Sequence, residues 1–108
     1  VTRGRVFDVI VDLRQGSDTF AQHISIELDA TDMKSVFVPA GFAHGFCSLT
    51  DDAEITYKMS DNFSPDHYRG LLWNDPALGI NWPIDPGDAI VSAKDSSHPT
   101  LKNLPQVF

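Results

Sequence analysis

The chain has 108 residues and a mass of 11.9 kDa, with 42% hydrophobic and 21% charged residues. That length and balance suit one compact domain spanning residues 1–108 and exclude wholesale disorder. Fifteen acidic residues against eight basic ones give a net charge of −7, so bulk charge disfavours nucleic acid or an anionic membrane as a partner. An anionic ligand would have to be held by a few well-placed cations.

Two observations bear on where the protein works. No apolar run approaches the roughly 18 residues of a membrane span. The single cysteine, Cys47, has no partner for an internal disulfide, which is typical of a reducing compartment. We therefore expect a cytoplasmic protein.

Two segments near the start alternate apolar and polar residues with the period of two that half-buried strands show. In residues 5–14 four apolar side chains share one face, namely Phe7, Val9, Val11 and Leu13. Residues 20–29 alternate in the same way after a turn cluster at 15–18. The polar residues 30–34 predict a connection or one short helical turn.

Further strands are predicted at residues 35–39, 41–49 and 53–60. Because short strands recur with turn signals between them, and no helical period is sustained, the sequence favours an all-β sandwich or barrel.

The residue pattern changes after residue 61, where six prolines interrupt the chain. Only brief strand candidates remain, at 70–73 and 89–92. Two large aromatic side chains, Trp73 and Trp82, need burial, so we predict ordered, packed loops here and not a linker.

A pair of polar residues is the first candidate for chemistry. A two-residue hairpin tip at Thr50-Asp51 would place His44 directly opposite Tyr57, with Cβ atoms about 5 Å apart. A three-residue tip would pair His44 with Lys58 instead. A polar pair among apolar neighbours is what a ligand pocket inside a barrel presents. The alternative is that both are amphipathic core residues with one hydrogen bond each.

Other chemistries find little support in the spacing of residues. The four histidines, at positions 23, 44, 67 and 98, show no metal-ligand pair, and Cys47 has no second thiol. A G-x-S-x-G elbow and a glycine-rich phosphate loop are both missing from the sequence. We expect His23 on a strand surface, and His67 and His98 in solvated loops.

Lys94 and Asp95 are adjacent in a predicted loop. On its own such a pair is more often a surface ion pair than a site. The ammonium group of Lys94 nevertheless suits a phosphate, and the carboxylate of Asp95 could orient a histidine that acts as a general base.

Several motifs occur in an order that carries more information than any one of them. They are RGRVFDVIVDLR at 3–14, SDTF at 17–20, PAGFAHGF at 39–46, YK at 57–58, WNDPALGI at 73–80, WP at 82–83 and SAKD at 92–95. Together they resemble the C-terminal portion of the dTDP-4-dehydrorhamnose 3,5-epimerase family.

The resemblance implies a cupin-type jelly roll (a double-stranded β-helix), without a metal or other cofactor and usually a homodimer. The implied reaction inverts C3 and C5 of a dTDP-4-keto-6-deoxyhexose through an enolate. Carried over by motif, Tyr57 is the proton donor and Asp95 the partner of the catalytic histidine. His44 binds in the sugar pocket, and Lys94 contacts the nucleotide phosphates.

Some residues depart from the family pattern. The resemblance places the general base in an upstream R-G-x-H segment near a lysine, and this sequence contains no such segment. Tyr68 stands where an acidic residue is expected, and Asn62-Phe63 where a tyrosine is expected. We therefore expect a jelly roll that is incomplete on its N-terminal side and inactive on its own. The alternatives are a non-catalytic cupin that binds a sugar nucleotide or a protein, and a related sugar-modifying enzyme.

Overall fold

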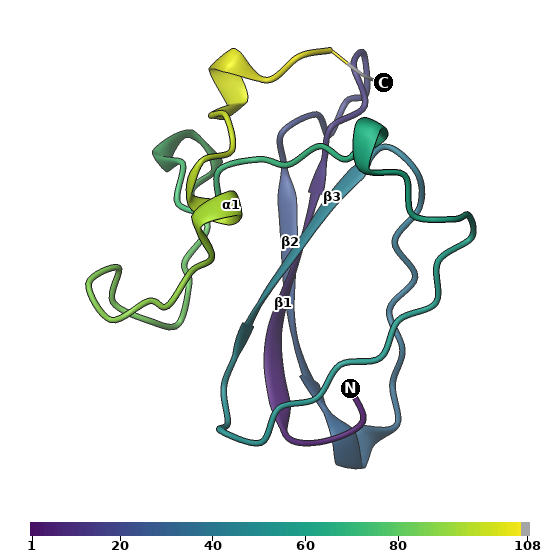
Figure 1. Cartoon of the computed structure of the whole chain (residues 1–108), viewed down its shortest axis with the longest axis vertical. Helices are drawn as coiled ribbons and strands as arrows, with labels where there is room; N and C mark the ends of the chain where they lie inside the picture. Colours follow the sequence, from purple (N-terminus) through teal and green to yellow (C-terminus); the bar gives the residue numbers. More distant parts are fainter. Residues whose placement is uncertain (107–108) are drawn as a thin grey trace.

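The computed structural model describes residues 1–106, in which three antiparallel strands form a sheet. The central strand β1 (Arg5–Asp12) lies between β2 (His23–Asp29) and β3 (Phe42–Ser48). Figure 1 shows the C-terminal third of the chain on one side of this sheet, while the segment after β3 crosses on the other side. Helices in the described part are short, and none is long and apolar enough to cross a membrane.

Strand β1 is buried on both faces over most of its length. Val9 and Val11, from the predicted apolar face, join Leu13 and Leu78 in the core, so the predicted alternation is confirmed. The opposite face is buried as well, including two carboxylates that the alternation assigned to a polar face, Asp8 and Asp12.

The connection from β1 to β2 is organised by the carboxylate of Asp12. It accepts hydrogen bonds from Arg14 at 3.0 and 2.9 Å, from Ser17 Oγ at 2.7 Å and from Thr19 Oγ1 at 2.6 Å. The amides of residues 20 and 22 bond within this turn. The second strand therefore begins at His23 and not at residue 20 as predicted.

Two predicted strands, at residues 35–39 and 53–60, do not form in the described structure. After β3 the chain continues beside the start of β1, because the Leu49 amide donates to the Arg5 carbonyl and the Glu54 amide to the Arg3 carbonyl. A single isolated bridge, between Arg3 and Glu54, is the only pairing of residues 53–60 within the part described. The edge of β3 is thus not paired by the segment that follows it.

The C-terminal part is built from turns, as predicted, and the brief strand candidates at 70–73 and 89–92 are irregular. The Trp82 indole donates to the Trp73 carbonyl at 2.8 Å, and Trp82 packs on the core below the sheet. The short elements are 3₁₀ helices at Ala30–Asp32, Pro65–His67, Pro76–Leu78 and Leu101–Asn103 and the one-turn helix α1 at Ala93–Ser96. Packed aromatic loops and the short turn after β2 are both confirmed.

Asp75 fastens these turns to one another. Its side chain is 7% exposed, caps the turn Pro76–Leu78 through the Ala77 amide, and accepts from the Leu101 amide at 2.7 Å. Both carboxylate oxygens are therefore used by backbone donors.

We expect Asp75→Asn to lower the free energy of unfolding by about 1–2 kcal/mol, because an amide offers one acceptor oxygen to two N–H donors. Urea unfolding measures the change. Asp85→Asn is the matched control, because Asp85 is exposed and should tolerate the same substitution. Equal effects of the two variants would show that the Asp75 carboxylate has no special role in stability.

Candidate active site

The best-defined polar pair of the sheet joins β1 to β3. His44 Nε2 lies 2.7 Å from Asp8 Oδ1. The two residues are diagonal neighbours across the strands, since His44 is opposite Ile10 and Asp8 is opposite Phe46, and diagonal side chains on one face are within reach. The pairing therefore follows from the register of β3 on β1.

The two partners differ in how far solvent reaches them. The Asp8 side chain is 4% exposed and that of His44 is 32% exposed. A buried carboxylate can thus orient an imidazole that a ligand can still touch, the arrangement that tunes histidine chemistry. Among residues 1–106 the second oxygen of Asp8, Oδ2, has no hydrogen-bond partner, so one buried acceptor of this carboxylate is unused within that range.

Asp8 was not singled out by the sequence, which assigned it only to a polar face. A carboxylate in the middle of a strand rich in valine and isoleucine was the available signal, because such a group is rarely buried without a partner.

A hollow of about 200 Å³ lies on the same side of the sheet as Asp8 and His44. Ile10, Ile24 and Phe42 line part of it.

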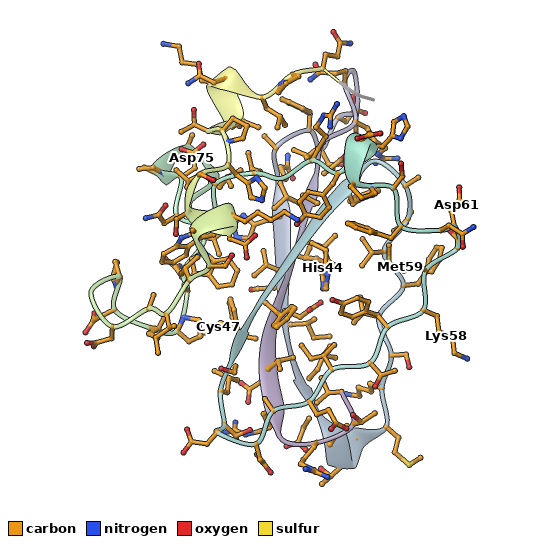
Figure 2. All side chains as sticks on the ribbon, viewed as in Figure 1. His44, Cys47, Lys58, Met59, Asp61 and Asp75 are labelled. Carbon is orange, nitrogen blue, oxygen red and sulfur yellow. The ribbon has the colours of Figure 1, made fainter. Side chains whose placement is uncertain are left out.

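The predicted pairing of His44 with Tyr57 is wrong, because residues 53–60 do not pair with β3 and His44 faces Ile10 instead. The Tyr57 side chain is 65% exposed. Figure 2 shows His44 on β3 and the segment carrying Met59 beyond it, with Lys58 pointing away from the sheet. Tyr57 therefore belongs to a segment that crosses the His44 side of the sheet without a hydrogen-bonded ladder.

Lys94 and Asp95 lie in α1 and not in a loop as predicted. Ser92 caps this single turn, because its hydroxyl accepts from the Asp95 amide at 3.1 Å, and Ser97 closes it by donating to the Lys94 carbonyl at 2.9 Å. The S-x-x-D spacing of Ser92 and Asp95 is that of a capping box and could have predicted the turn. The motif SAKD thus has a structural role in presenting both side chains.

His98 contradicts the prediction of a solvated loop residue. Its side chain is 15% exposed and lies 3.4 Å from Asp95 Oδ1. Its ring lies against the backbone at Gly70, where a β-carbon would overlap it. By contrast, His67 is exposed, as predicted, with its ring nitrogen hydrogen-bonded to Ser64.

The described structure groups the predicted site residues into two clusters. His44 and Asp8 form one on the sheet, and Lys94 and Asp95 form the other on α1, where they contact Tyr68 and His98. No hydrogen bond or ion pair among residues 1–106 joins the two clusters or links either of them to Tyr57. In the same range, no three His, Cys, Asp or Glu side chains are arranged to hold a metal ion.

Comparison with known proteins gives a consistent result. The family model of dTDP-4-dehydrorhamnose 3,5-epimerase matches residues 1–103. The chain belongs to this family. The matched range includes every motif discussed above, with the segments around Asp8, His44, Tyr57 and Asp95.

Individual relatives agree. A dTDP-4-dehydrorhamnose 3,5-epimerase of Sinorhizobium fredii is 50% identical over 107 residues, which are 99% of this chain and 54% of that protein. The chain spans about half the length of the curated relatives that it matches.

Solved structures extend the likeness to the fold. The epimerase of Bacillus anthracis, with TDP and PPi bound, has a TM-score of 0.90 at 44% identity, over 94% of this chain and 57% of that one. A dTDP-6-deoxy-D-glucose-3,5-epimerase of Legionella pneumophila in complex with dTDP-4-keto-L-rhamnose has a TM-score of 0.91 at 36% identity, over 97% and 55%.

Proposed function

We propose that the protein takes part in epimerising a dTDP-4-keto-6-deoxyhexose at C3 and C5, in dTDP-rhamnose or related deoxysugar biosynthesis. The observation that carries the proposal is the Asp8–His44 pair, in which a buried carboxylate holds a partly exposed imidazole. Membership of the epimerase family supports the same reaction.

The reaction class sets the requirements for the site. A base removes the proton beside the keto carbon, and the bonding electrons move onto the keto oxygen as an enolate. An acid then returns a proton to the opposite face of the same carbon, the ketone re-forms, and the configuration is inverted. Groups aimed at the developing oxyanion lower the barrier, and a positioned acid or base contributes roughly 10²–10⁴-fold to the rate.

We assign roles to four residues on the basis of the family motifs. Tyr57 returns the proton, and Asp95 partners the catalytic base. His44, oriented by Asp8, binds the sugar through its second ring nitrogen. Lys94 contacts the diphosphate. No histidine of this sequence stands in an R-G-x-H segment, so the base itself is not assigned to any of the 108 residues.

The finer points of fold and assembly belong to the same proposal. We infer that residues 1–108 belong to a single cupin-like domain of the jelly-roll type and that the protein is a homodimer. A cytoplasmic location suits a nucleotide-sugar substrate and the single cysteine, Cys47.

A non-catalytic cupin that binds a sugar nucleotide is the second candidate. What favours it is that no hydrogen bond or ion pair among residues 1–106 joins His44 to Lys94 or Asp95, or any of these to Tyr57. Both candidates predict that a sugar nucleotide binds. They differ in whether hydrogen at C3 and C5 of the sugar exchanges with solvent.

Incubation with dTDP-4-keto-6-deoxyglucose in D₂O separates them. Deuterium at C3 and C5, seen by NMR, is the result that the epimerase predicts, because each inversion takes its returning proton from solvent. Exchange at C3 alone would identify a relative that epimerises one carbon. Binding by calorimetry without exchange would support the non-catalytic candidate, and neither binding nor exchange would contradict both.

A further inference from the structure

Three aromatic rings form a cluster beside α1, which we call the ring cluster: Phe63, Tyr68 and His98. The Tyr68 ring packs edge-on against Phe63, with centroids 6.1 Å apart, and lies 5.9 Å from the His98 ring at an angle of 35°. Because Gly70 leaves room for the His98 imidazole against the backbone, Tyr68 is supported by a ring that is itself packed.

Lys94 places its ammonium group over this cluster. Its Nζ lies 3.5 Å from the centroid of the Tyr68 ring, well within the range of a cation–π interaction. The residue is exposed, and no carboxylate in residues 1–106 forms an ion pair with it. In the same part of the chain Arg5 and Arg14 are both paired with acidic side chains.

That Lys94 contacts a ring, whereas Arg5 and Arg14 contact carboxylates, matters in a chain with a net charge of −7. A carboxylate partner would neutralise the ammonium group and compete with an anionic ligand for its N–H donors. An aromatic face attracts the cation without neutralising it, and the N–H groups turned away from the ring stay available. A free lysine side chain also gives up rotamer entropy when it binds, and part of that loss is already incurred when the ring holds it.

We propose that Tyr68 is a positioning residue that holds the Lys94 ammonium over its ring, ready to contact the phosphates of a nucleoside diphosphate. The inference rests on the proposed function for its ligand, while the contact itself is a property of this chain. Phe63 and His98 act through Tyr68 by fixing its ring, and Ser92 and Ser97 act through α1 by fixing the backbone of Lys94.

The contact can be measured without any ligand. Protons held above an aromatic ring resonate upfield, so the ε-methylene signal of Lys94 should be shifted upfield in the NMR spectrum of the protein. Tyr68→Phe keeps the ring face and should keep the shift, whereas Tyr68→Leu should abolish it. An unshifted Lys94 signal in the unsubstituted protein would overturn the inference.

The consequence for binding is tested with dTDP as the probe, by calorimetry at low salt. We expect Tyr68→Leu to weaken binding roughly threefold, which corresponds to a part of the rotamer entropy that a free lysine side chain loses on binding, and Tyr68→Phe to leave it unchanged. If Tyr68 acts through Lys94, Tyr68→Leu should have no further effect in a Lys94→Met background. Lys102→Met, which removes an exposed charge elsewhere, is the control for net charge.

The outcomes separate this inference from the function on which it rests. Two results would overturn the positioning role alone, provided that the unsubstituted protein binds dTDP. In the first, Tyr68→Leu leaves the affinity for dTDP unchanged. In the second, Tyr68→Leu weakens binding equally with and without Lys94. Failure of the unsubstituted protein to bind dTDP, with the upfield Lys94 signal present, would contradict the proposed function and with it the role in phosphate contact.

Discussion

In a full-length protein that epimerises at C5, replacing Tyr57 by phenylalanine is expected to slow the return of a proton by about a hundredfold or more, the contribution that a positioned acid makes. Binding of dTDP should stay within about twofold, because the substitution removes one hydroxyl and keeps the ring. Deuterium incorporation at C5 and calorimetry on the same preparation measure the two quantities.

The structure explains why the hydroxyl can be reached. The Tyr57 side chain is 65% exposed, on the segment that carries Lys58 and Met59 past His44 without a regular strand pairing (Figure 2). The backbone of a residue in a hydrogen-bonded ladder is fixed, so the position of its side chain can adjust little to a ligand. A residue on an unpaired segment can adjust to a ligand, for which we propose that His44 binds the sugar and Lys94 the diphosphate.

Ser60→Ala is the matched control for Tyr57→Phe. It also removes one hydroxyl from the same exposed segment, and neither exchange nor binding should change. Loss of dTDP binding in Tyr57→Phe would point to a binding role, and unchanged exchange at C5 would show that another group is the proton donor.

The strands that the sequence predicted correctly are those that carry a strong alternation. Phe7, Val9, Val11 and Leu13 define a face that is buried whatever the neighbouring strand is, so β1 could be placed from local pattern alone. The strand predicted at 53–60 had the same kind of composition but lacked a partner. Whether such a segment pairs depends on where the preceding turn directs the chain, and here Thr50 and Glu54 bond to the start of β1.

In the candidate site too, local sequence patterns could be read in advance and long-range contacts could not. His44, Lys94 and Asp95 could be selected by motif, because the family resemblance assigns a role to each of these positions. The partner of Asp8 could not be selected from the sequence, because it depends on the register of β3 on β1, which is a long-range property. The contacts of Tyr68 with Lys94 and with His98 join residues 26 and 30 positions apart, and no local sequence pattern predicts them.

Asp12 is the residue whose loss should cost the fold most. The Arg14 side chain, followed by Thr19 and Ser17, hydrogen-bonds the carboxylate and holds its pKa well below the usual range, although burial acts in the opposite direction. Asp12→Asn would leave the Arg14 guanidinium without its anion and two hydroxyl groups with a poorer acceptor. We expect the melting temperature at pH 7 to fall by about 10 °C, measured by circular dichroism.

The pH dependence gives this prediction a second, independent check. A carboxyl whose pKa is lower in the folded state than in the unfolded chain adds stability above its unfolded pKa, and that stability is lost as pH falls toward the folded value. The gap in melting temperature between the unsubstituted protein and Asp12→Asn should therefore be full at pH 7 and narrow as pH is lowered below about 4.

Asp18 provides the control, because it lies in the same turn, is exposed, and carries the same charge. Asp18→Asn removes one negative charge from a chain of net charge −7 without touching the hydrogen bonds around Asp12, and its melting temperature should stay within about 2 °C of the unsubstituted protein. If the two variants melted alike, simple charge reduction would account for both. If the Asp12→Asn gap widened in acid, the carboxylate would not be the group that Arg14, Ser17 and Thr19 stabilise in its charged form.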